Sequence, residues 1–227
     1  MSLYYDEFAN DDLHVVGLEG LVPASGVGYA AELLAQIPEE VDRGLSSGNP
    51  FDGISIPAGA VVLDLGCGTG RDCLIARGMV GESGRVVGLD ESAAMLQEAQ
   101  RLSAGFGYEN VAFHCGSVLD LPFADASMGF VISNCVFNQI ENKHAAFAQV
   151  ARVLEPGGVF SFSDVMKTPE ASPRLARSKT LCLARAVLVQ DYLDALLDVG
   201  FSSARLQEAR PWPTYRGVVS AHIIAVR

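Results

Sequence analysis

Short apolar runs alternate along this chain with longer stretches in which apolar residues recur at helical spacing. The apolar runs predict buried strands at 61–65, 85–90, 111–115, 129–134 and 158–163. The stretches between them predict helices at 70–79, 92–104 and 142–154. Ser92 is placed to cap the second of these helices. Alternation of this kind predicts a parallel sheet covered by helices on both faces, a three-layer α/β sandwich.

The two ends of the chain depart from this alternation. After the fifth strand, a helix at 189–199 is followed by strands at 203–208 and 218–226 with no helix between them, which predicts a C-terminal antiparallel hairpin. Residues 1–55 form an N-terminal extension, in which Tyr29 to Val41 has the spacing of an amphipathic helix. We therefore divide the chain into a helical extension at 1–55 and a main domain at 56–227. The pattern leaves open whether the extension is a lid.

Composition limits the cellular compartment and the classes of partner that we expect. The 227 residues include 16 basic and 27 acidic ones, for a net charge of −11. Nucleic-acid binding depends on Lys and Arg, so we expect no nucleic-acid partner. The apolar runs fall far below the roughly 20 residues of a membrane span, and the N-terminus does not resemble a signal peptide, so we expect no membrane partner. Five cysteines without a C-x-x-C pair do not indicate a disulfide framework, which favours a cytoplasmic protein.

The most informative segment is a glycine-rich turn between the first strand and the first helix. It reads Asp64-Leu65-Gly66-Cys67-Gly68-Thr69-Gly70, a G-x-G-x-G pattern. Glycine at such a turn lets a ligand approach the bare backbone. Asp90 ends the next strand, where an acidic residue suits a ribose diol. The simpler alternative is a turn that only helps a helix pack on the sheet.

Two further segments extend this pattern: Leu121-Pro122-Phe123-Ala124-Asp125-Ala126-Ser127 and Val153-Leu154-Glu155-Pro156-Gly157-Gly158. Together with the turn they resemble class I S-adenosylmethionine-dependent methyltransferases. The resemblance implies S-adenosylmethionine as cofactor, with contacts from Asp64, Gly66, Gly68, Asp90, Glu91, Met95, Val118 and Asn134. The family often has Asp beside the adenine where this chain has Ser117. We therefore expect adenine recognition at the Val118 backbone, with Met95 or Glu91 beside the ring.

A cysteine follows the fourth strand, in Ile132-Ser133-Asn134-Cys135-Val136-Phe137-Asn138. Taken alone, Cys135 reads as a buried packing thiol. This segment, together with Arg71-Asp72-Cys73, Tyr4-Tyr5 and the stretch around Cys182, resembles arsenite methyltransferases. The resemblance implies that Cys135 and Cys182 bind trivalent arsenic directly, and it suggests glutathione or another small thiol as a partner. Trivalent arsenic is soft and favours thiolate ligands, and its lone pair needs no general base.

One departure from that family concerns the substrate. Its members carry further cysteines before the glycine turn, one of them in the loop where this chain has Ser47.

Three hypotheses about function follow: methylation of arsenite or of an arsenic–thiol adduct, methylation of another small-molecule O, N or C acceptor, and a non-catalytic protein that binds the cofactor or a metalloid. Cys67, Cys73 and Cys115 are expected to pack in the interior, and a flap of Tyr4 and Tyr5 over the cofactor stays open.

Overall fold

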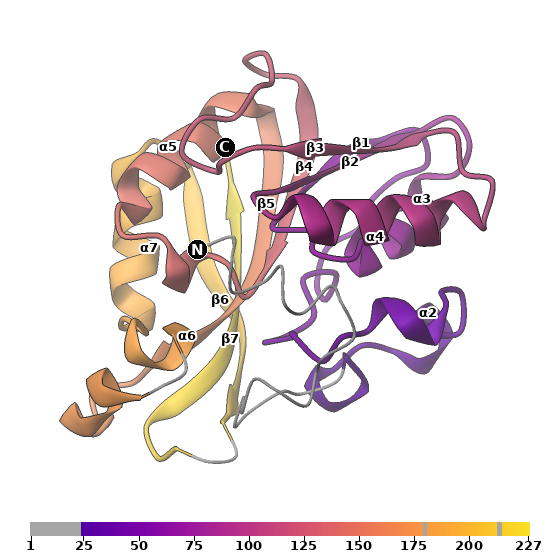
Figure 1. Cartoon of the computed structure of the whole chain (residues 1–227). Helices are drawn as coiled ribbons and strands as arrows, with labels where there is room; N and C mark the ends of the chain where they lie inside the picture. Colours follow the sequence, from indigo (N-terminus) through magenta and orange to yellow (C-terminus); the bar gives the residue numbers. More distant parts are fainter. Residues whose placement is uncertain (1–23, 179–180, 213–214) are drawn as a thin grey trace.

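The computed structural model describes residues 24–178, 181–212 and 215–227. Within these ranges seven strands form one sheet, in the order β3-β2-β1-β4-β5-β7-β6 (Figure 1). The strands are β1 (Val61–Leu65), β2 (Arg85–Asp90), β3 (Val111–Cys115), β4 (Met128–Asn134), β5 (Leu154–Lys167), β6 (Ser203–Pro211) and β7 (Val218–Val226). The first five are parallel, while β7 runs antiparallel between β5 and β6. The predicted parallel sheet and C-terminal hairpin are confirmed.

Helices cover both faces of this sheet (Figure 1). The longer ones are α3 (Arg71–Val80), α4 (Ala93–Ala104), α5 (Lys143–Val153) and α7 (Val189–Asp198), and the short ones are α2 (Ala31–Leu34) and α6 (Leu181–Ala184). Single 3-10 turns lie at η1 (Ala24–Val27), η2 (Glu39–Val41), η3 (Phe137–Gln139) and η4 (Pro173–Arg177). Ser92 caps α4 as predicted, because its hydroxyl accepts a hydrogen bond from the Met95 N–H at 3.1 Å.

Each face of the sheet has its own apolar core. Under α5 and α7 the core is largely aromatic, with Phe137 stacked on Phe147 at 4.8 Å between ring centroids and Phe160 on Phe162 at 4.6 Å. The opposite core combines side chains of β1, β2 and α3 with Tyr29 and others from the N-terminal segment. Residues 24–55 are therefore packed against the sheet domain, although the predicted boundary after residue 55 stays a prediction.

Two sequence predictions about elements were wrong. The helix predicted from Tyr29 to Val41 is broken into α2 and η2, because Pro38 lacks an N–H and disfavours helical backbone at the residue before it. Strand β5 starts at Leu154 rather than at 158. Residues 155–158 bulge there, since Met128 pairs with Leu154 while Phe130 pairs with Val159.

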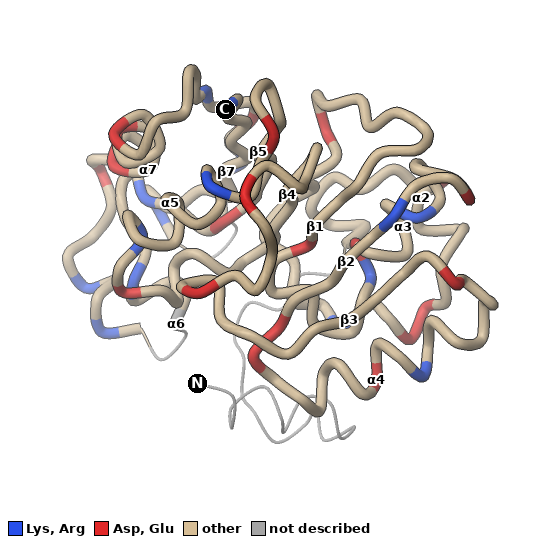
Figure 2. Tube along the Cα trace, turned by 90° about the horizontal axis from the view of Figure 1, so that it is seen from above, with Lys and Arg blue, Asp and Glu red and all other residues tan. Residues whose placement is uncertain are grey.

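The surface carries charge on many elements. Lys and Arg positions are spread over helices on both sides of the sheet, and Asp and Glu positions lie among them (Figure 2). None of the helices in the described ranges is long and apolar enough to cross a membrane. Tyr4 and Tyr5 lie outside the described residues.

Candidate active site

The glycine turn joins β1 to α3 at the carboxyl edge of the parallel strands, where open α/β sheets bind ligands. The N–H groups of Gly66 and Cys67 both donate to the Leu89 carbonyl, which ties the turn to β2. Gly66 has φ +68°, and a Cβ there would overlap a Val136 methyl. Gly68 has φ +53°, and a Cβ there would have nothing within 4 Å. The turn therefore presents open backbone at Gly68.

Two carboxylates frame this turn. Asp90 accepts the Gly68 N–H at 2.9 Å through one oxygen and the Ser92 N–H at 2.9 Å through the other. Burial raises the pKa of Asp90, while these two N–H groups act in the opposite direction. Asp64 is almost fully buried and accepts a hydrogen bond from the Cys73 thiol. Burial and the neighbouring Asp72 raise the pKa of Asp64 well above its usual range.

A cavity of about 760 Å³ opens beside the turn and extends past the end of β4. It is lined by every residue that the sequence singled out for the cofactor or for arsenic: Asp64, Gly66, Gly68, Asp90, Glu91, Met95, Val118, Asn134, Cys135 and Cys182. The glycine turn, the acidic residues and the two cysteines thus border one common cavity. Its size falls within the range typical of small-molecule and cofactor sites.

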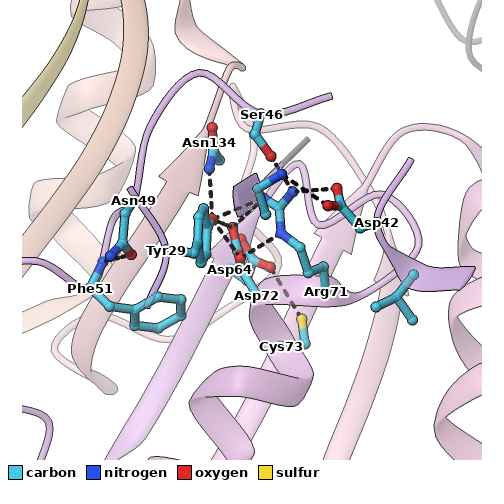
Figure 3. Close-up of polar contacts among 12 residues, drawn as sticks. Tyr29, Asp42, Ser46, Asn49, Phe51, Asp64, Arg71, Asp72, Cys73 and Asn134 are labelled. Atoms are coloured by element: carbon cyan, nitrogen blue, oxygen red, sulfur yellow. Dashed lines mark hydrogen bonds and ion pairs between the residues drawn. The ribbon is translucent and has the colours of Figure 1, made fainter. Parts of the chain in front are cut away.

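A polar network that the sequence analysis did not anticipate borders the cavity (Figure 3). The Tyr29 hydroxyl donates to Asp72 at 2.7 Å and accepts from Arg71 at 2.9 Å and from the Asn134 amide at 2.8 Å. Arg71 also pairs with Asp42 at 3.4 Å. The Arg71-Asp72 dipeptide was part of the family resemblance, but nothing in the sequence linked it to Tyr29. The network ties the N-terminal segment to the end of β4.

Cys135 and Cys182 are brought together in this cavity, although 47 residues separate them. Cys135 has φ +61°, which is uncommon for a non-glycine residue and marks a sharp turn after β4. Interaction with the Cys182 thiol, together with burial, raises the pKa of Cys135 well above its usual range. The same interaction lowers the pKa of Cys182. The two thiols therefore interact directly inside the cavity.

Ser47 lies against this thiol pair. It is fully buried, and its side chain interacts with that of Cys135. Ser47, which the family resemblance compared with a cysteine, thus lies beside Cys135 in the fold. Within the described ranges, no three His, Cys, Asp or Glu side chains are grouped to hold a metal ion.

The remaining cysteines divide in two groups. Cys67 and Cys73 are buried, as expected, and interact beneath the glycine turn. Cys115 is exposed, and the expectation that it packs was wrong. It ends β3, which is one of the two edge strands of the described sheet and is exposed at its last two residues.

Comparison with known proteins shows the family of the chain. A model of the methyltransferase domain family matches residues 56–200, more than half of the chain. The chain belongs to this family, in the class I type that uses S-adenosylmethionine as cofactor.

Its relatives point to a narrower group. The chain is 38% identical over 183 residues to an arsenite methyltransferase of Halobacterium salinarum, covering 79% of this chain and 47% of that protein. It is 36% identical over 172 residues to one of Aquipseudomonas alcaligenes, covering 70% and 50%. The crystal structure of an arsenic(III) S-adenosylmethionine methyltransferase from Chlamydomonas reinhardtii matches with a TM-score of 0.74 and 31% identity, covering 86% and 71%. The chain spans about half the length of the two curated relatives.

Proposed function

We propose that this protein transfers the methyl group of S-adenosylmethionine to trivalent arsenic held by Cys135 and Cys182. The observation that carries the proposal is the shared cavity: the glycine turn with Asp90 and the thiol pair line one space of about 760 Å³. The arsenite methyltransferases among its relatives support this choice of acceptor. Arsenite itself or an arsenic–thiol adduct, such as one with glutathione, would be the substrate.

The cofactor part of the cavity fits S-adenosylmethionine. Open backbone at Gly68 admits a ligand that a side chain would exclude. Asp90 is fixed by two backbone N–H groups and would accept the ribose hydroxyls, while Val118 and Met95 supply apolar surface for the adenine. When bound, the cofactor supplies an electrophilic methyl group on a cationic sulfonium. Asp64, Gly66, Glu91 and Asn134 complete the proposed contacts.

The thiol pair would bind and orient the arsenic. Arsenite, As(OH)₃, exchanges two hydroxyl groups for two sulfur ligands and releases two molecules of water, so its oxidation state does not change. Cys135 and Cys182 would each supply one of these two sulfur ligands, since both line the same cavity. The arsenic lone pair is the nucleophile, and the protein contributes mainly by fixing its direction and excluding water.

A second candidate is methyl transfer to another small-molecule O, N or C acceptor. Ser47 favours it, since a hydroxyl beside Cys135 replaces a thiol that would strengthen arsenic binding. Under this alternative Cys135 and Cys182 are not needed for turnover.

The decisive experiment is methyl transfer from labelled S-adenosylmethionine to arsenite with excess glutathione, with the products separated by arsenic-specific chromatography. Methylated arsenic that disappears in Cys135→Ser and in Cys182→Ser supports the proposal. If the wild-type protein binds the cofactor but forms no methylated arsenic, the proposal fails and other small acceptors are to be tested.

A further inference from the structure

Two reciprocal hydrogen bonds join the turn after β4 to the segment that carries Cys182. The side-chain amide of Asn138 donates to the Cys182 carbonyl at 3.1 Å. In the opposite direction, the Arg185 guanidinium donates to the Gln139 carbonyl at 2.8 Å. Each segment thus holds the backbone of the other, and we call this pair of bonds the clasp.

The Asn138 side chain is itself held in place by several hydrogen bonds. It is fully buried, and its backbone N–H donates to Asp164 at 2.9 Å. Its side-chain oxygen accepts the Tyr192 hydroxyl at 2.8 Å, while its amide also donates to the Val165 carbonyl. Both ends of the side-chain amide are therefore fixed by β5 and α7, and the amide has little freedom to turn away from Cys182.

The other thiol is held by the same turn. The Cys135 N–H donates to the Ser163 carbonyl at 2.9 Å, and the Gln139 side chain donates to the Cys135 carbonyl at 2.8 Å. Cys135 and Gln139 thus belong to one rigid unit. The clasp connects this unit to the segment of Cys182, and Arg185 adds an ion pair with Glu141 at 3.4 Å.

We propose that Asn138 and Arg185 are positioning residues that hold the Cys135 and Cys182 thiols at chelating separation. The inference rests on the proposed function, because it assigns the thiol pair to one bound arsenic atom. Two thiols that are already adjacent bind one arsenic with little further loss of chain entropy, whereas a mobile Cys182 would first have to be ordered. Loosening the clasp would therefore lower chelate affinity and leave each thiol chemically intact.

The test uses phenylarsine oxide, a trivalent arsenical that two thiols chelate with release of one water and no change of oxidation state. Binding to the full chain is measured for the wild type, Asn138→Ala, Cys182→Ser and the double variant. We expect Asn138→Ala to weaken binding about 10- to 100-fold in the wild-type background, as loss of an outer contact does at metal sites. In the Cys182→Ser background it should have almost no effect, because no chelate remains to be positioned.

Arg185→Ala provides a second variant, since Arg185 lines the cavity and is only partly buried. It should weaken chelation in the same direction, and Arg185→Lys, which keeps a donor for the Gln139 carbonyl, should restore part of it. Arg177→Ala is the matched control, because it removes an equal charge from an exposed position outside the cavity. Melting temperatures show which variants are folded.

Three results would overturn the inference. The first is wild-type affinity no higher than that of Cys182→Ser, since no chelating pair would then exist. The second is an Asn138 effect of equal size in both backgrounds, which would indicate general destabilisation. The third is unchanged chelation in Arg185→Ala. If chelation and coupling are found but no methylated arsenic forms, the clasp holds while the proposed acceptor is wrong.

Discussion

Ser47 and Asn134 are joined by two hydrogen bonds, from the backbone N–H of Ser47 at 2.9 Å and from its hydroxyl at 3.1 Å, both to the Asn134 side-chain oxygen. Asn134 directly precedes Cys135, so these bonds fix Ser47 beside the thiol pair. The Asn134 amide returns a bond to the Gly48 carbonyl at 2.7 Å. The N-terminal segment thereby becomes one wall of the candidate arsenic site.

Ser47→Cys should strengthen arsenite binding, because a third thiol would replace a weakly binding hydroxyl beside Cys135. We expect the dissociation constant for arsenite to fall by about tenfold or more, which corresponds to about 1.4 kcal/mol. Titration of the arsenic–sulfur ultraviolet absorption measures this directly. Ser47→Ala is the control for loss of the hydroxyl, and equal affinities in the Cys and Ala variants would contradict the prediction.

Asp90→Asn should weaken S-adenosylmethionine binding. The substitution keeps the size of the side chain but removes its charge, and an amide nitrogen must then face one of the two backbone N–H groups that Asp90 accepts. Hydrogen bonds to charged groups contribute about 1.5–3 kcal/mol, so we expect roughly a 10- to 100-fold loss of affinity. Isothermal titration calorimetry measures it. Asp120→Asn, at an exposed position outside the cavity, should bind normally, and normal binding by Asp90→Asn would refute the assignment.

Asp164 should make stability depend on pH. Burial raises the pKa of Asp164 from 3.8 to about 6, so between about pH 4 and 6 the folded protein binds more protons at this site than the unfolded chain does. The contribution of Asp164 to the free energy of unfolding is therefore fully present below pH 4 and is lost as the pH rises through 6. The difference in unfolding free energy between the wild type and Asp164→Asn should fall by up to about 3 kcal/mol across this range.

Urea unfolding of both proteins at a series of pH values provides this measurement. His222, whose pKa burial lowers to about 4, contributes a slope of opposite sign in the same range. Because His222 is present in both proteins, its contribution cancels in the difference between their unfolding free energies. A difference that stays constant from pH 4 to 6.5 would show that Asp164 titrates normally.

Tyr29→Phe should destabilise the fold while keeping the ring in its buried place. The hydroxyl bonds to Asp72, Arg71 and Asn134, and its loss removes one buried hydrogen-bond partner from each of them, although Arg71 and Asp72 stay paired with each other. We expect the free energy of unfolding to fall by about 2 kcal/mol. Chemical denaturation measures it, with Tyr108→Phe, outside this network, as the control. Equal stabilities of the two variants would show that the network is not needed to hold the N-terminal segment.

The sequence by itself determined most of the local elements and the position of the glycine turn between β1 and α3. Apolar runs specified the strands because a buried strand must be apolar on both faces, and the glycine turn had to adopt positive φ where a side chain does not fit. Asp90 could be predicted to lie beside this turn because it ends the next strand, at a fixed distance along the chain. The prediction of one helix from Tyr29 to Val41 was wrong for a local reason too, since Pro38 interrupts an otherwise helical pattern.

Only the tertiary structure decided what lies beside the thiols. Cys135 and Cys182 meet because the turn after β4 and the segment around α6 fold against each other, and Ser47 joins them through Asn134. The same holds for Tyr29 and Arg71, whose contact depends on how the N-terminal segment crosses the sheet. Contacts between residues so far apart in the chain leave no local pattern in the sequence. Their pairing is fixed only when the sheet order and the packing of both helical layers are fixed.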